Sequence, residues 1–183
     1  MEVIKCVYWG GPLSTDTAVN TGETRRDFQV VIAGSNGYTS TSISTPPGYS
    51  SAVPLGNAAI NAPLDCNKAN TYMGAKIFSS GPFDAGRCAA ACTAQSDYNL
   101  RHPPKDKKPQ TCQFFNTYVL YKNNSPVGQY CSLYNETWTP AFATNRGETR
   151  GADKYTIAYS FSFSNGTANA DKPVGCTNPT SPN

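Results

Sequence analysis

The stretch Asp84-Ala-Gly-Arg-Cys88-Ala-Ala-Ala-Cys92 carries the strongest fold signal in this chain. Asp84 is a good helix N-cap, because its carboxylate can accept hydrogen bonds from the first free backbone N–H groups of a helix. The residues that follow it predict a helix over 85–94. Cys88 and Cys92 are four residues apart, so their side chains stand on the same face of this helix, one turn apart.

Short runs rich in β-branched and aromatic residues predict strands on both sides of this helix. They cover 3–9, 28–33, 72–78, 112–121, 127–133 and 155–164. The runs 112–121 and 127–133 flank an Asn-Asn-Ser-Pro turn and predict a hairpin. In 155–164, large apolar residues alternate with small or polar ones, which predicts one buried and one solvated face. The segment 45–63, rich in Pro, Gly and Ser, is predicted to be a long irregular connection.

The composition supports a β-rich fold with one domain, or one domain with an extension. Only 15% of the 183 residues are charged, and 15 Gly and 14 Pro are present, which suits a loop-rich β protein. The net charge of +3 does not indicate a nucleic-acid partner. The basic run 101–108 is broken by prolines, so we interpret it as a solvated loop rather than an anionic-ligand site. No apolar stretch approaches the roughly 18 residues that a membrane span needs.

Seven cysteines and three glycosylation sequons indicate an oxidising, secretory environment. The sequons begin at Asn123, Asn135 and Asn165. Zinc binding would require closely paired Cys-x-x-Cys or His ligands, and the sequence has neither. We therefore expect disulfides, and we expect no metal and no other cofactor. Met1 is followed directly by strand-like sequence, so we expect any native leader or upstream region to have been removed.

The central cysteine pattern resembles that of the PAN/Apple family. The matching motifs are the helix with Cys88 and Cys92, then Cys112-Gln-Phe-Phe, then Gly128-Gln-Tyr-Cys131. The resemblance implies a β-dominated α+β fold in which an antiparallel sheet is crossed by one helix. It also implies the bridges Cys88–Cys131, Cys92–Cys112 and Cys66–Cys176. The geometry agrees, because two cysteines on one helical face can reach two adjacent strands but not each other comfortably.

This resemblance also implies a domain organisation. Residues 66–176 form the PAN/Apple-like module, residues 1–65 an N-terminal β extension, and residues 177–183 a flexible tail. The long basic loop before Cys112 and the long segment after Cys131 depart from the family pattern. Cys6 has no counterpart in the family and is the odd cysteine. The chain is also similar to secreted cysteine-rich proteins of filamentous fungi.

A short internal repeat links the two ends of the chain. Asn20-Thr-Gly-Glu-Thr-Arg25 is nearly repeated as Asn145-Arg-Gly-Glu-Thr-Arg150, and each copy precedes a predicted strand. We infer that the N-terminal third resembles the tail half of the later module. It is either a partial duplication that folds against the module or the end of an upstream copy. We expect similar turns at both places, and we expect the strands at Phe28 and Tyr155 to lie near each other in one β-layer.

Exposed aromatic residues are the sharpest candidates for a binding site, since Trp and Tyr can stack on sugar rings and anchor protein interfaces. The candidate ligand-binding residues are Trp9, Trp138, Tyr134, Arg146 and Arg150. The alternative for each Trp is a place in the core under the sheet. The alternative for the arginines is a structural salt bridge to Glu23, Glu148 or Asp153.

We therefore expect an extracellular, non-catalytic recognition module for a glycan or a protein surface, with a role in adhesion or host interaction. No catalytic residue is assigned, because the only histidine is His102 and no nucleophile or phosphate-loop motif is present. The second hypothesis is a small hydrolase or lyase that acts on cell-wall polysaccharide through carboxylates such as Glu23 and Glu148. The third is a structural wall or matrix glycoprotein. A carboxylate pair in a deep cleft would favour the second hypothesis, and an aromatic surface the first.

Overall fold

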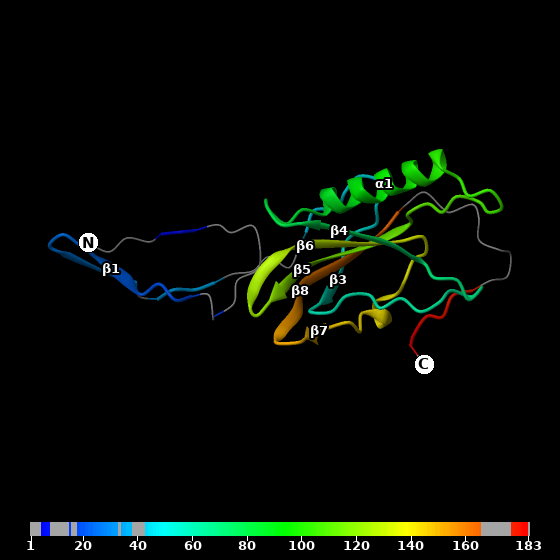
Figure 1. Ribbon diagram of the computed structural model, residues 1–183. Helices are drawn as coiled ribbons and strands as arrows, with labels where there is room; N and C mark the ends of the chain where they lie inside the picture. Colours follow the sequence, from blue (N-terminus) through cyan, green and yellow to red (C-terminus); the bar gives the residue numbers. More distant parts are fainter. Residues whose placement is uncertain are drawn as a thin grey trace.

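The computed structural model describes residues 5–7, 15, 18–32, 34–37, 43–165 and 177–182. Its main body is an antiparallel sheet of six strands with a helix lying across one face (Figure 1). The strands are β3 (Val53–Gly56), β4 (Tyr72–Phe78), β5 (Phe114–Lys122), β6 (Ser125–Tyr134), β7 (Gly147–Arg150) and β8 (Asp153–Ser164). Their order is β3-β8-β5-β6-β4, and β7 also pairs with β8. The protein is thus a β-dominated α+β fold with antiparallel strands, as predicted.

The helix α1 (Ala85–Arg101) begins where the sequence predicts and ends later. Asp84 caps it by accepting a hydrogen bond from the Gly86 N–H at 2.8 Å. The first turns bury Ala85, Cys88, Ala89 and Cys92 against the sheet. The later turns are largely polar, so they lack the apolar periodicity from which a longer helix would have been predicted. Two prolines follow His102 and prevent the helix from continuing.

Two disulfides join this helix to the strands beneath it. Cys88 is bonded to Cys131 on β6, and Cys92 is bonded to Cys112 just before β5. These are the predicted pairs. The chain segments that they close span 43 and 20 residues, so loop-closure entropy gives them stabilisations of about 4 and 3 kcal/mol.

The remaining cysteines are placed only in part. Cys6 is a free, exposed cysteine, as expected for the odd member of the set. Cys66 is engaged in an interaction, and its predicted partner Cys176 lies outside the described residues.

A buried polar network fixes the start of the helix above the sheet. The Gln129 side chain on β6 donates to the Asp84 carbonyl at 2.8 Å and to the Thr117 hydroxyl at 2.9 Å. Its carbonyl oxygen accepts from the Asp84 N–H at 3.1 Å. Because every polar atom of this amide has a partner, Gln129 can be buried at low cost and it sets the position of α1 over β5 and β6.

The strand β8 does not have the single buried face that its alternating sequence predicts. Tyr159 has a left-handed φ of 54°, and the register with β5 shifts by one residue at this point. This bulge reverses the alternation, since one extra residue turns every later side chain to the opposite face. Phe161 and Phe163 consequently pack on the helix side, whereas Ile157 packs with Tyr118 in a separate cluster. The prediction of one buried and one solvated face is therefore wrong.

The sheet also includes residues that the predicted domain boundary placed in the N-terminal extension. The strand β3 pairs with β8, although 45–63 was expected to be irregular. The Asn116 side chain holds the following segment by accepting from the buried Ile60 N–H at 2.9 Å. Proline at position 54 is compatible with β3, because this strand lies at an edge of the sheet.

The predicted flexible tail is attached where the structure describes it. Asn178 accepts from the Cys66 N–H at 3.1 Å and donates to Glu136 at 3.2 Å. The Thr180 carbonyl accepts from the Thr139 hydroxyl at 2.7 Å. Hydrogen bonds of Asn178 and Thr180 therefore attach this segment to the body of the protein.

The N-terminal strands β1 (Gly22–Arg25) and β2 (Phe28–Val31) form a separate two-stranded hairpin. Figure 1 shows this hairpin apart from the six-stranded sheet. Its turn matches the turn at β7–β8, as the repeated sequence predicts: Arg25 lies opposite Phe28 as Arg150 lies opposite Asp153, and the next residue has a left-handed φ in both turns. The expectation that the strands at Phe28 and Tyr155 share one β-layer is wrong, because β2 pairs with β1 and β8 lies in the large sheet.

Candidate functional site

Two of the predicted binding aromatics belong to the core. Trp138 is 2% exposed and Tyr134 is 4% exposed, so the expectation of exposed rings at these positions is wrong. Trp138 packs edge-on against Phe142 at 5.2 Å between ring centroids and donates its indole N–H to Thr71 at 3.0 Å. The Tyr134 hydroxyl donates to the Ile60 carbonyl at 3.1 Å.

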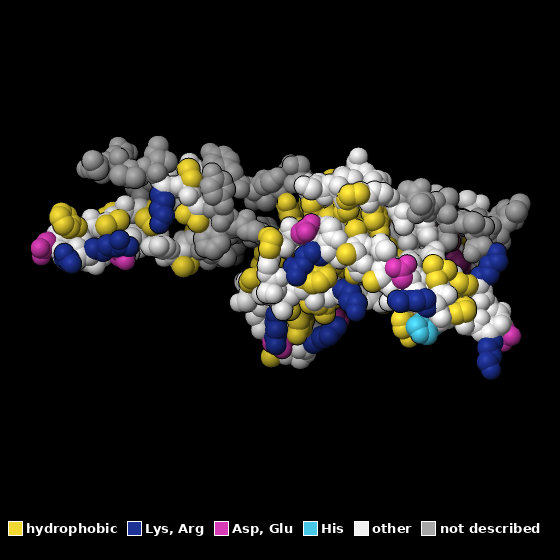
Figure 2. Space-filling view, turned by 90° about the horizontal axis from the view of Figure 1, so that it is seen from above, with side chains coloured by type: hydrophobic (Ala, Val, Ile, Leu, Met, Phe, Trp, Pro, Cys, Tyr) yellow, Lys and Arg dark blue, Asp and Glu magenta, His cyan; other side chains and the backbone are white. Residues whose placement is uncertain are grey.

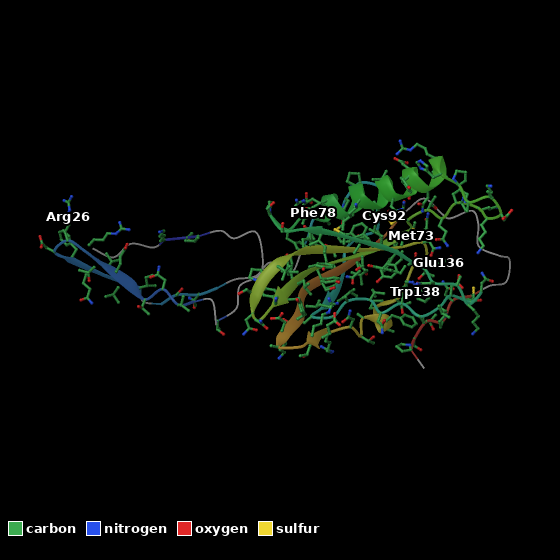
Figure 3. The ribbon with its side chains drawn as sticks, in the orientation of Figure 1. Arg26, Met73, Phe78, Cys92, Glu136 and Trp138 are labelled. Carbon is green, nitrogen blue, oxygen red and sulfur yellow. A yellow bond between two sulfur atoms is a disulfide. The ribbon has the colours of Figure 1, made fainter. Side chains whose placement is uncertain are left out.

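The cause of this burial is the position of Trp138 on the side of the sheet away from α1 (Figure 3), where Tyr134 packs in the same cluster. The segments that follow β3 and β6 cover this part of the sheet, and the polar atom of each ring has a hydrogen-bond partner. Trp9, the other predicted anchor, lies outside the described residues.

The predicted arginines lie at the surface. Arg150, the last residue of β7, forms an ion pair with Glu148, and its guanidinium lies 5.4 Å from the centre of the Tyr155 ring. The salt-bridge alternative is thus confirmed for Arg150. Arg146 is exposed one residue before β7.

Arg150 lies on the rim of a groove formed by three neighbouring strands and β7. We call it the tyrosine groove, and its volume is about 240 Å³. The groove is lined by Tyr118 and Leu120 of β5, Tyr130 of β6, Tyr155 and Ile157 of β8, and Asn145, Gly147, Glu148 and Arg150 at β7. It is smaller than the roughly 300 Å³ at which pockets for drug-sized ligands begin. It can therefore hold a single ring or side chain of a larger ligand.

Aromatic rings form the floor of the tyrosine groove. Tyr118 and Tyr130 face each other across the β5–β6 ladder, and their rings stack at 5.4 Å with an angle of 15° between planes. Burial raises the pKa of Tyr118 to about 12, although a hydrogen bond with Ser132 opposes this effect. This phenol therefore stays protonated at neutral pH and keeps both a donor and an acceptor function.

The rim of the groove depends on a glycine in an unusual conformation. Gly147 has a φ of 108°, and its N–H donates to the Asn145 side chain at 2.9 Å. A Cβ atom at this position would lie 2.1 Å from the Tyr155 carbonyl oxygen, so only glycine allows β7 to approach β8 here. Glu148 and Arg150, on the same face of β7, are thereby placed beside Tyr155.

Sequence reasoning included Arg150 in the site but missed Tyr118, Tyr130 and Tyr155 as its floor. The signal was available in part, because the predicted hairpin pairs Tyr118 with Tyr130 once its register is known. Tyr155 could not be added from the sequence, since its face depends on the pairing of β8 with β5.

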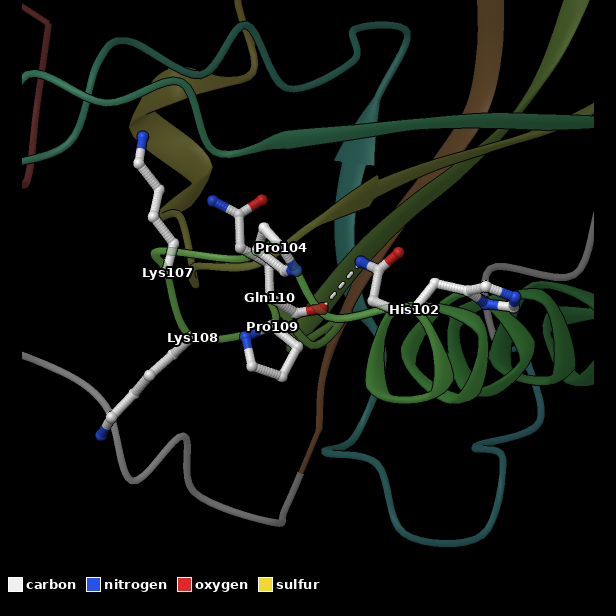
Figure 4. A pocket seen from close by; sticks show the side chains of 7 residues that line it. His102, Pro104, Lys107, Lys108, Pro109 and Gln110 are labelled. Carbon is white, nitrogen blue, oxygen red and sulfur yellow. Dashed lines mark hydrogen bonds between the residues drawn. The ribbon is translucent and has the colours of Figure 1, made fainter.

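A second hollow lies at the end of α1, in the basic loop (Figure 4). It has a volume of about 340 Å³ and is lined by His102, Pro104, Lys107, Lys108, Pro109 and Gln110, together with Asn99. The Asn99 amide donates to the Gln110 carbonyl at 2.8 Å and holds the loop against the helix. Figure 4 shows the side chains of Lys107 and Lys108 pointing in different directions rather than converging. Residues 101–108 are all exposed, in agreement with a solvated loop.

The carboxylates proposed for catalysis do not form a pair. Glu23 is ion-paired with Arg25 in the hairpin β1–β2, whereas Glu148 is ion-paired with Arg150 in the large sheet. Within the described part of the chain, no group of three or more His, Cys, Asp or Glu side chains could hold a metal ion.

The three sequon asparagines lie at strand ends. Asn123, in the β5–β6 turn, is exposed, but its amide donates to Asp153 and accepts from the Lys154 N–H, both at 2.8 Å. Asn135 and Asn165 are half-buried directly after β6 and β8.

Among the described residues, α1 is too short and too polar to span a membrane. No protein-family model, curated protein or solved structure matches this chain.

Proposed function

We propose that this protein is a secreted, non-catalytic recognition module whose tyrosine groove binds a glycan. The observation that supports this proposal is the combination of an aromatic floor with a charged rim. The half-buried rings of Tyr130 and Tyr155 offer apolar surface that suits the apolar face of a sugar ring, and Tyr118, which is 7% exposed, supports Tyr130 by stacking against it. Glu148 and Arg150 offer an acceptor and several donors to the hydroxyl groups around that ring.

Binding agrees better with this geometry than polysaccharide cleavage does. Glycosidases typically place two carboxyl groups about 5–10 Å apart on either side of the scissile bond. Glu148 is the only carboxylate among the groove-lining residues, and Arg150 holds it in an ion pair. A protein surface presenting one aromatic or aliphatic side chain is the second candidate ligand, because the groove accommodates a single such group.

The PAN/Apple resemblance and the extracellular location belong to the same proposal. In support of the family assignment, the two helix-to-strand bridges have the pairing that the resemblance implies. An oxidising compartment is supported by the two disulfides themselves, because disulfides form and persist in such compartments. We accordingly place the protein outside the cell or in the cell wall, with fungal origin, glycosylation and a role in adhesion as parts of the proposal.

The repeated Gly-Glu-Thr-Arg sequence offers a matched pair of variants for the test. A glycan array covering neutral and acidic polysaccharide fragments is screened first, and the best oligosaccharide is then titrated by calorimetry. Arg150→Ala is expected to weaken binding by roughly tenfold or more, since Arg is often a dominant contact. Arg25→Ala removes the same ion pair from the hairpin β1–β2, outside the groove, and should leave the affinity unchanged.

Two results would overturn the proposal. Equal affinities of wild type and Arg150→Ala for the same oligosaccharide would exclude the tyrosine groove as the site. Release of soluble sugars from a polysaccharide, abolished by Glu148→Gln but not by Glu23→Gln, would instead identify an enzyme.

A further inference from the structure

The hairpins β1–β2 and β7–β8 are two copies of one structural unit. Gly22 has a φ of 125°, donates to the Asn20 side chain at 3.0 Å, and would place a Cβ 2.0 Å from the Val30 carbonyl oxygen. Glu23 and Arg25 form an ion pair. Each of these features has its counterpart at the equivalent position of β7–β8, so the likeness extends from the sequence to the backbone, the turn and the side-chain contacts.

The register of the two hairpins defines which residues correspond. Arg25 lies opposite Phe28 as Arg150 lies opposite Asp153. It follows that Val30 corresponds to Tyr155, which lines the tyrosine groove, and that Ile32 corresponds to Ile157.

In the body of the protein, this unit is one half of a larger arrangement. The strand β8 pairs on its far side with β5, and Ile157 lies opposite Leu120. Ile157 is buried there to 5% exposure, whereas Val30 and Ile32 are each 45% exposed. Figure 2 shows hydrophobic side chains at the surface of the hairpin. The N-terminal hairpin therefore corresponds to the β7–β8 half of the tyrosine groove, and it lacks the other half, which β5 and β6 form in the body.

Within the part of the chain that the structure describes, the backbone of β2 presents a matching open edge. Ile32 donates its N–H to the Thr21 carbonyl of the adjoining strand at 3.1 Å, so the N–H and C=O groups of Gln29 and Val31 point to the opposite side. In the described residues, β2 pairs only with β1. The equivalent outward groups of Lys154 in the body are both satisfied by Asn123, at the end of β5.

We propose that β1–β2 is a docking hairpin for another module of the same architecture. The open edge of β2 pairs antiparallel with a strand equivalent to β5. Ile32 then lies opposite the residue equivalent to Leu120, and Val30 lies opposite the residue equivalent to Lys122, as Ile157 and Tyr155 do in the body. This pairing is independent of the ligand of the tyrosine groove.

One difference between the hairpins specifies the partner further. Asp153 forms an ion pair with Lys122 of β5 at 2.8 Å, whereas the corresponding residue of the hairpin is Phe28, which is 73% exposed. The partner strand therefore carries an apolar side chain at the position that Lys122 occupies in β5.

The test uses the full ¹⁵N-labelled chain and a synthetic peptide of residues 116–122 that carries Lys122→Leu and a solubilising polar tail. We expect saturable chemical-shift changes at Gln29 and Val31, with slower exchange of both amides. Val31→Pro removes one outward N–H without breaking the β1–β2 ladder, and it should weaken peptide binding by about tenfold. Thr24→Pro removes an outward N–H from the other edge of the hairpin, that of β1. The corresponding edge of β7 pairs with no further strand among the described residues, so this variant should leave binding unchanged.

A nuclear Overhauser contact between the Hα atoms of residues 24 and 29, which lie opposite each other, verifies that the hairpin persists in each variant. The proposal is overturned if the peptide causes no change at β2, or if Val31→Pro with an intact hairpin binds as tightly as the wild type. It is also overturned if a peptide of the β4 sequence, residues 72–78, binds the same edge equally well, because the edge would then accept any strand.

Discussion

Replacing Trp138 should lower the free energy of unfolding far more than replacing an aromatic residue at the surface. The ring is 2% exposed and packs with Ile60, Phe114, Tyr134 and Phe142. Burial of a Trp side chain removes about 200 Å² from water, which corresponds to about 5 kcal/mol at 25 cal/mol per Å². Aromatic-to-alanine changes in cores typically cost about 3–5 kcal/mol. We expect Trp138→Ala to lower the free energy of unfolding by a value in this range.

The matched variant Trp138→Phe separates packing from hydrogen bonding. It keeps an aromatic ring near Phe142 but leaves the Thr71 hydroxyl, buried to 1% exposure, without its indole partner. An unpaired buried hydroxyl costs about 1–3 kcal/mol. Adding Thr71→Val should consequently recover part of the loss in the Phe variant, although the same change destabilises the wild type.

The measurement is guanidinium unfolding without reductant, followed by circular dichroism because the substitutions remove a fluorophore. The midpoint and slope give the free energy of unfolding for each variant. A cost below about 1 kcal/mol for Trp138→Ala would show that this ring is not part of the core. A larger cost of Thr71→Val in the Phe variant than in the wild type would refute the assigned hydrogen bond.

Two other predictions concern the hairpin β7–β8. Hydrogen bonds from Lys122 and Asn123 lower the pKa of Asp153, so the ionised carboxylate stabilises the folded state above the unfolded pKa of about 3.9. This stabilisation disappears as the pH falls through the lowered pKa. The difference in urea midpoint between wild type and Asp153→Asn should therefore vanish in strong acid. A difference that grew on acidification would contradict the assignment. Gly147→Ala should lower the melting temperature of the body, since its Cβ would lie 2.1 Å from the Tyr155 carbonyl oxygen. Gly22→Ala should leave the melting temperature of the body unchanged. Equal effects of the two variants would show that the two hairpins unfold together.

Local features of the sequence predicted the parts of the fold that depend on near neighbours. The capping side chain of Asp84 contacts the N–H of Gly86, two residues away, so the start of α1 is readable from a short stretch. The repeated Gly-Glu-Thr-Arg turn is similarly local, since Asn20 and Asn145 each bind the N–H two residues ahead. The cysteine pairing could not be predicted from local features alone, and it was predicted from the resemblance to a family with known connectivity.

The candidate site could be predicted only in part, because it depends on which faces of the strands are covered. Arg150 was identified because the repeat marked its position. Trp138 was misplaced because an aromatic residue after a strand has the same sequence signature whether it lies in solvent or under a covering loop. The loop that buries it comes from the distant segment around Ile60, held by Asn116.

By itself, the sequence determined the β-rich composition, the beginning of the helix, the hairpin turns and the separation of the odd cysteine from the others. The tertiary structure alone decided which side chains share a surface. The bulge at Tyr159 moves Phe161 and Phe163 to the helix side, while Tyr155 remains beside Tyr118 and Tyr130 in the tyrosine groove. The physical reason is that a strand's side-chain alternation has a period of two residues, so a single bulge, stabilised by contacts with distant strands, reverses every face that follows it.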